Sequence, residues 1–342
     1  MIKFRCTWFL ARALVLATVL PAIAQHDASA VSESPIPVIT GNFSFQSAFQ
    51  PGTLTLSPEF DPVVLVPLGR SLLVESEFDM SISPMRTGGQ WGPAVVNHGF
   101  EYLQLDYMVN PHLTIVVGRF LTPFGIYRER LHPMWIRSLP DEPIIFPMND
   151  NSSNGVMLRG VTRLTGEMNL TYAAYYSAPT RNSQFMADRR GGGRASLFFP
   201  NRRVEVGVSY SRVLNSRYNM LGADLTWNLK KLPLDIRSEV VHSAIVGSGY
   251  WVEGAYRLSK VGRNPLIHNS ELAIRGEQYR LPRVAQTLIT DLPSQNTTRA
   301  TLGWNYYFHN GVRFDVSYGR DFSATSSHHT WIVGLTYRFA FL

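Results

Sequence analysis

Apolar and polar residues alternate along most of the chain from Val38 onward. The segment 300–308, ATLGWNYYF, shows the pattern clearly, and the last segment places an apolar residue at every second position from Trp331 to Phe341. Successive side chains of a β-strand point to opposite faces, so this period predicts strands with one apolar and one polar face. Alternating segments of about ten residues are typical of transmembrane β-strands.

Sixteen segments carry this pattern. The segment 53–66 is the least regular, because Pro58 and Pro62 interrupt it and a proline cannot donate to a ladder. An even number of strands is what a single-chain bacterial barrel with both termini on one side requires. The predicted strands are 39–49, 53–66, 70–82, 98–109, 112–121, 154–165, 167–177, 191–199, 202–213, 218–229, 233–245, 249–260, 268–280, 297–309, 311–322 and 328–342.

The lengths of the connections alternate as well. Counted from the first strand, the even-to-odd connections are the short ones, at 67–69, 110–111, 166, 200–201, 230–232, 261–267 and 310. The odd-to-even connections contain every long insert, at 83–97, 122–153, 178–190 and 281–296. Bacterial barrels combine short periplasmic turns with longer outside loops. In a soluble β-sandwich no membrane distinguishes the two ends of the strands, so this alternation of loop lengths is not expected.

The longest insert, 122–153, is the third outside loop on this count. It contains five prolines, which exclude a strand or a regular helix. It is also rich in large apolar residues, including Trp135, Ile144, Ile145 and Phe146, for which an exposed loop would have little use. We therefore predict a structured loop that folds inward and packs against a wall.

The N-terminus has the features of a secretory signal peptide at residues 1–24. A basic start and an apolar core precede Ala22-Ile23-Ala24, which is typical of a cleavage site. Residues 25–37 are predicted to be a periplasmic lead-in to a barrel at 38–342. The only cysteine, Cys6, lies in the predicted signal, so the mature chain is expected to have no disulfide.

The charge of the chain is moderately basic. The formal net charge is +7, and the predicted signal holds three basic residues and no acidic one, which leaves +4. This excess does not indicate a nucleic-acid partner. No run of about 18 apolar residues follows the signal, so no helical membrane span is predicted. Together these features predict an all-β fold, namely a transmembrane antiparallel β-barrel of about sixteen strands with a long, inward-folded third extracellular loop.

Two local motifs carry a family resemblance. The turn GRFLTPFG at 118–125 follows a strand, and the ending YRFAFL resembles the C-terminal signal of outer-membrane proteins, with Phe341 in the penultimate position. With these motifs the chain resembles the sixteen-stranded porins related to the phosphate-selective porin O/P group. The resemblance implies a location in the bacterial outer membrane and a third loop that narrows the lumen.

We expect the charged residues of the third loop to lie at the pore constriction, where fixed charges select ions by raising the local concentration of one sign. The alternative is that these residues pair with one another and with the wall, and only hold the loop in place. The alternative is favoured for any single arginine, and selectivity is favoured for the set. The set is Arg128, Arg130, Arg137, Glu129, Asp141 and Glu142.

The polar residues at alternate positions of each strand, which we call the polar parity, predict a charged lumen wall. Acidic residues on this parity are at least as numerous as basic ones, so a basic ladder suited to phosphate is not expected. Most of these charges are expected to form cross-strand pairs that stiffen the wall. The predicted wall includes Arg159, Arg163, Arg237, Arg257, Arg275, Arg313, Glu75, Glu77 and Asp79.

The predicted function is passive diffusion of small hydrophilic solutes or ions. Two other classes stay open: a closed barrel that serves as a structural or adhesive protein or as a sheath for an electron-transfer partner, and, less favoured, an outer-membrane enzyme. No residue spacing indicates a catalytic, cofactor or metal site. The expected partners are outer-membrane lipid and lipopolysaccharide, the barrel assembly machinery and small hydrophilic solutes. A homotrimer stays open, and no nucleic acid is expected.

Overall fold

The structure is a computed structural model that describes residues 36–148, 152–182, 185–262, 264–282, 289, 291–324 and 327–341. The predicted signal peptide at 1–24 lies outside the described residues. So do residues 25–35 of the predicted lead-in and residues 149–151 of the predicted constriction loop.

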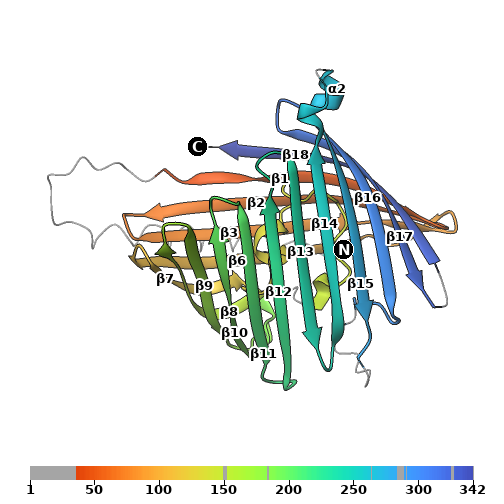
Figure 1. The fold of residues 1–342 in the computed structure, drawn as a ribbon. Coiled ribbons are helices and arrows are strands. Elements are labelled where there is room, and N and C mark those ends of the chain that lie inside the picture. Colours follow the sequence, from red (N-terminus) through yellow and green to blue (C-terminus); the bar gives the residue numbers. More distant parts are fainter. Residues whose placement is uncertain are drawn as a thin grey trace. The chain divides into compact units, whose positions relative to one another are not determined.

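Sixteen long strands of the described chain form one antiparallel sheet that closes on itself, because β1 pairs with both β2 and β18 (Figure 1). The predicted barrel and its strand number are confirmed. The strands are β1 (Val38–Gln50), β2 (Thr53–Leu68), β3 (Leu72–Ser83), β6 (Val95–Asn110), β7 (Leu113–Leu121), β8 (Ser152–Thr165), β9 (Met168–Ser177), β10 (Arg190–Phe199), β11 (Val204–Val213), β12 (Tyr218–Asn228), β13 (Leu234–Ser243), β14 (Gly247–Arg257), β15 (Ser270–Arg280), β16 (Thr297–Tyr307), β17 (Val312–Ser323) and β18 (Ser327–Phe341).

The two parities of the strands face opposite sides of the barrel wall. Ile274 and Leu302, on the apolar parity, are 63% and 57% exposed, whereas their polar neighbours Arg275 and Thr301 are buried. The apolar side chains therefore form the outer surface, and the polar ones point into the lumen, as the alternating pattern predicted.

The connections divide between the two ends of the barrel. We call the end that carries the connection between β7 and β8 the long-loop end, and the other the short-turn end. Most short turns lie within one to three residues of the prediction, and the largest departure is the connection between β14 and β15, which spans 258–269 rather than 261–267. The strand ends early because residues Leu258–Lys260 form a 3-10 turn (η5), and the side chain of Asn264 then caps the short helix α2 (Pro265–His268).

The predicted insert at 83–97 is partly ordered as strand. β3 and β6 extend into it, and between them lie the short strands β4 (Met85–Thr87) and β5 (Gln90–Trp91), with β4 paired to β2. Among the described residues no helix is both long enough and apolar enough to cross a membrane.

The connection after β7 folds into the barrel, as predicted. We call its described part, residues 122–148, the inner loop. It contains only short helical turns, a π-helical turn η2 (Tyr127–Leu131) and a 3-10 turn η3 (Phe146–Met148), as its prolines predicted. Its buried apolar side chains are Phe124, Ile126, Tyr127, Leu131, Met134, Leu139, Ile144, Ile145, Phe146 and Met148.

We expect a charge on the outer surface to cost far more than one on an inward position that borders open space. Leu302→Arg should cost about 2–4 kcal/mol of folding free energy in phospholipid vesicles if it lies near the bilayer midplane. Thr171→Arg, whose side chain lines a cavity, should be much milder. Urea titration of both variants in vesicles measures the difference, and equal costs would contradict the assignment of faces. Thr301 and Ser317 are unsuitable controls, because each is inward but only 2% exposed.

Candidate functional site

The backbone amides of the inner loop are bonded by carboxylates of the wall. Glu239 of β13 accepts from the amides of Ile126 and Tyr127, with N–Oε2 distances of 3.1 and 3.3 Å. Glu277 of β15 accepts from the amide of Ile144 at 2.5 Å. A buried segment without regular secondary structure must find other partners for its peptide groups. These two wall carboxylates supply acceptors.

The carbonyl groups of the inner loop are bonded by donors from the next strands. Arg313 of β17 donates to the carbonyl oxygens of Arg137 and Met134 at 2.5 and 3.0 Å. Asn305 of β16 donates to the carbonyl of Ser138 at 2.8 Å. The wall from β13 to β17 therefore holds the loop through its main chain, and the predicted wall residue Arg313 serves this purpose.

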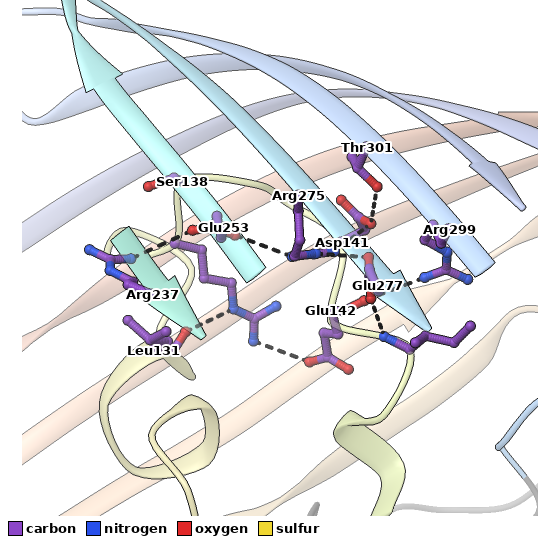
Figure 2. A network of polar contacts seen from close by, with 12 residues as sticks. Leu131, Ser138, Asp141, Glu142, Arg237, Glu253, Arg275, Glu277, Arg299 and Thr301 are labelled. Carbon is purple, nitrogen blue, oxygen red and sulfur yellow. Dashed lines mark hydrogen bonds and ion pairs between the residues drawn. The ribbon is translucent and has the colours of Figure 1, made fainter. Parts of the chain in front are cut away.

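A buried ion network joins the loop to β14 and β15 (Figure 2). The side chain of Arg275 is only 1% exposed. Its guanidinium nitrogens lie 2.7 Å from Asp141 of the loop, 2.8 Å from Glu277 and 3.4 Å from Glu253. Arg237 approaches Glu253 at 3.8 Å. The predicted constriction residue Asp141 and the predicted wall residues Arg237 and Arg275 thus belong to one network that fastens the loop.

An apolar cluster inside the barrel completes the attachment. The ring of Tyr127 packs edge-on against Phe146 and Trp251, with centroids 5.0 and 6.0 Å apart. Sequence reasoning missed the wall half of this cluster, which occupies the inward parity near the long-loop end. The signal that could have revealed it is the run of large apolar residues at positions where polar ones were expected. These wall residues are Val213, Tyr218, Met220, Val241, Trp251 and Tyr279.

Three inward glycines of the wall provide hollows for apolar side chains of the loop. A Cβ atom on Gly249 would lie 2.4 Å from Ile145, and one on Gly303 would lie 2.4 Å from Leu139. A Cβ atom on Gly222 would lie 3.0 Å from the ring of Phe124. The loop therefore fits the wall as closely as residues in a protein core fit one another.

Two of the predicted constriction arginines are enclosed in protein. Arg128 is buried and pairs with Glu101 of β6. Arg137 is buried and donates to the carbonyl of His132 and to Glu142, the latter at 3.2 Å. Both guanidinium groups thus bond to the loop or the wall, which is the alternative that the sequence left open for single arginines.

Open space remains on the opposite side of the inner loop, next to β3, β6 and β8. A cavity of about 170 Å³, the narrow cavity, is lined by Glu75, Glu77, Tyr102, Gln104, Glu129 and Arg159, among others. A wider cavity of about 430 Å³ reaches the turn between β6 and β7, with His112, Thr114, Arg130 and Arg194 in its lining. Glu129 and Arg159 line both cavities, so the two adjoin at these side chains.

The arginines that line these cavities are already paired. Arg130 forms two bonds to Glu205, at 2.6 and 2.8 Å. Arg159 pairs with Asp106. Arg194 lies 2.6 Å from Asp224 and 3.2 Å from Glu205. Their positive charge is largely offset where it meets the open space.

The remaining predicted wall arginines lie near the short-turn end. Arg163 is exposed and donates to the carbonyl of Thr165. Arg257 has a side chain 60% exposed, pairs with Glu271 at 3.1 Å and lies 4.8 Å over the ring of Tyr307. The geometry places both away from the narrow cavity.

A cluster of carboxylates on β2 and β3 has the chemistry of a hard-cation ligand set. Glu59, Asp61 and Asp79 have ligand oxygens within 4.8 Å of one another. Asn42 donates to Asp61 at 2.7 Å. Oxygen donors of this kind suit calcium or magnesium. Sequence reasoning placed Asp79 on the wall but did not bring these strands' acids together.

His132 of the inner loop lies among positive charges. Its Nδ1 is 3.2 Å from Nη1 of Arg128. Burial and the charges of Arg128 and Arg137 lower the pKa of His132 well below its usual value. The docked loop therefore holds this imidazole in its neutral form.

Solved structures similar to this chain are outer-membrane proteins. The loop L8 deletion mutant of OmpT, an outer membrane protein of Vibrio cholerae, is 12% identical with a TM-score of 0.55, over 90% of this chain and 100% of that one. The anion-selective porin from Comamonas acidovorans is 10% identical with a TM-score of 0.57, over 89% and 99%. OprB from Pseudomonas putida is 11% identical with a TM-score of 0.55, over 88% and 92%.

At these identities the likeness is one of fold. It extends to outer-membrane porins in general and does not single out the phosphate-selective O/P group that the two sequence motifs resemble. No protein-family model and no curated protein matches the chain.

Removing the buried guanidinium should release the loop. We expect Arg275→Leu to cost about 3–5 kcal/mol, because it leaves Asp141, Glu253 and Glu277 without their shared cation. Arg257→Leu is the matched control, and its exposed pair should be worth about 1 kcal/mol or less. Urea titration followed by tryptophan fluorescence measures both. Similar costs would show that the network does not fasten the loop.

Acid should loosen the loop through His132. The unfolded imidazole takes up a proton near its ordinary pKa of about 6.5, whereas the docked one resists it. Stability of the docked loop is therefore full above that pH and declines as the pH falls below it. We expect the protection factors of loop amides, that is, their exchange rates corrected for the intrinsic rate at each pH, to be lower at about pH 5 than at about pH 7.5, with the difference abolished in His132→Gln and kept in His112→Gln. A difference that survives in His132→Gln would assign it to another group.

Proposed function

We propose that this protein is an outer-membrane porin that lets small hydrophilic solutes or ions diffuse passively along one side of its lumen. The observation that carries the proposal is the pair of adjoining cavities beside the inner loop, which have charged and polar linings. A lumen of sixteen strands is wide enough for water unless it is filled. Most of the inner loop's attachments are to β11 to β17, and the two adjoining cavities lie between the loop and β3 to β10.

The outer surface supports a membrane location. A band of exposed aliphatic side chains, including Val208, Ile274 and Leu302, covers the middle of the wall. Exposed aromatic side chains flank this band at both ends, as in the interfacial girdles of transmembrane barrels. They are Tyr107, Trp227, Phe308, Tyr337 and Phe341 at the short-turn end, and Phe49, Tyr176, Tyr250, Phe322 and Trp331 at the long-loop end.

A closed barrel with a structural role is the second candidate, and one observation favours it. The inner loop contacts the wall on both sides of the lumen. Arg128 of the loop pairs with Glu101 of β6, on the side of the barrel opposite the attachment of the loop to β13 and β15. A barrel crossed in this way could be sealed. Conductance separates the two candidates.

Purified protein in planar lipid bilayers should give ion-conducting steps. The chain allows a sharp second test, because its one cysteine lies in the predicted signal peptide. Glu129→Cys places a single thiol where the two cavities adjoin, and a bulky thiol reagent should then block most of the current. Glu167→Cys, on the exposed turn between β8 and β9, is the matched control and should be insensitive. No conductance from correctly folded protein would favour the closed barrel.

A further inference from the structure

The narrow cavity has carboxylates that form no close ion pair within the described chain. Among the described residues, Glu75, Glu77 and Glu129 form no ion pair with an arginine or lysine within 4.0 Å. Glu75 accepts a hydrogen bond from the neutral amide of Gln104 at 3.1 Å. Glu77 is only 2% exposed, and no side chain of the described chain donates to it. Glu75 and Glu129 are only partly buried and border the open space, so their negative charge favours a mobile cation there.

The positive charges along the same path are offset. Arg130, Arg159 and Arg194 each pair with at least one carboxylate of the wall. Arg128 and Arg137 of the inner loop are buried and pair with Glu101 and Glu142. The electrostatic surplus at the narrow cavity is therefore negative.

The net charge of the whole chain argues the other way. It is +7 formally and +4 without the predicted signal, which alone would suggest attraction of anions. Salt screens exposed charges beyond about 8 Å, whereas charges in a narrow, partly enclosed space are screened much less. Fixed charges in such a space raise the concentration of the opposite ion. The local carboxylates should outweigh the distant basic residues.

We infer that the path beside the inner loop is selective for cations, and that Glu75, Glu77 and Glu129 are the residues that determine this preference. The inference rests on the proposed porin function. It assigns small monovalent cations and organic amines as the favoured class of solute, and it gives the loop's acid Glu129, rather than its arginines, the role in ion selection.

The test is the reversal potential in a potassium chloride gradient. The unaltered protein should pass potassium in preference to chloride. The variant with Glu75→Gln, Glu77→Gln and Glu129→Gln keeps the shapes of the side chains and should lower the potassium-to-chloride permeability ratio about threefold or more. Glu167→Gln and Asp188→Asn remove exposed charges outside the narrow cavity and should leave the ratio unchanged. Glu129→Gln alone, on the loop rather than the wall, gives a partial decrease and serves if the triple variant does not fold.

The outcomes separate the two proposals. Conductance with a preference for chloride overturns the inference and leaves the porin function standing. So does a preference for potassium that the three substitutions do not change. Absence of conductance in every salt, from protein that is folded, overturns the porin function itself.

Discussion

The structure depends on the need of the inner loop's peptide groups for hydrogen-bond partners. Residues 122–148 lie inside the barrel with only short helical turns, so few of their amides and carbonyls can bond to one another. The wall supplies what is missing: Glu239 and Glu277 accept, and Arg313 donates. Charges on the inner wall from β13 to β17 are thereby committed to the loop, and the two adjoining cavities lie beside β3 to β10.

The alternating pattern was sufficient to predict the barrel and its strand number, and the prolines and large apolar residues of the longest insert predicted the inward loop. A period of two is imposed by the backbone, and the face of each residue follows from it, as Ile274 and Arg275 show. The partners of inward residues do not follow, because they depend on where the loop crosses the lumen. Arg275 was expected to pair across strands, and it does, but it also binds Asp141 from the loop.

For the charged residues of the loop, the sign of the charge proved less informative than whether the side chain borders open space. The sequence placed Arg128 and Arg137 at the constriction together with other basic and acidic residues of the loop, and did not indicate which of them border the pore. Both are enclosed by protein, whereas Glu129, between Arg128 and Arg130 in the chain, borders the open space. Neighbouring residues of a helical turn point in different directions, and no periodic pattern in a proline-rich loop indicates which one faces water.

The three inward glycines limit how the sequence of such a barrel can change during evolution. Gly222, Gly249 and Gly303 are hollows shaped for Phe124, Ile145 and Leu139, on strands far from the loop in the sequence. A larger residue on either side would force the loop away from the wall. The loop is therefore not an exchangeable insert, because another barrel would lack the hollows that accept its side chains. Substitutions at the apolar residues of the loop must be matched during evolution by substitutions in the strands that contact them.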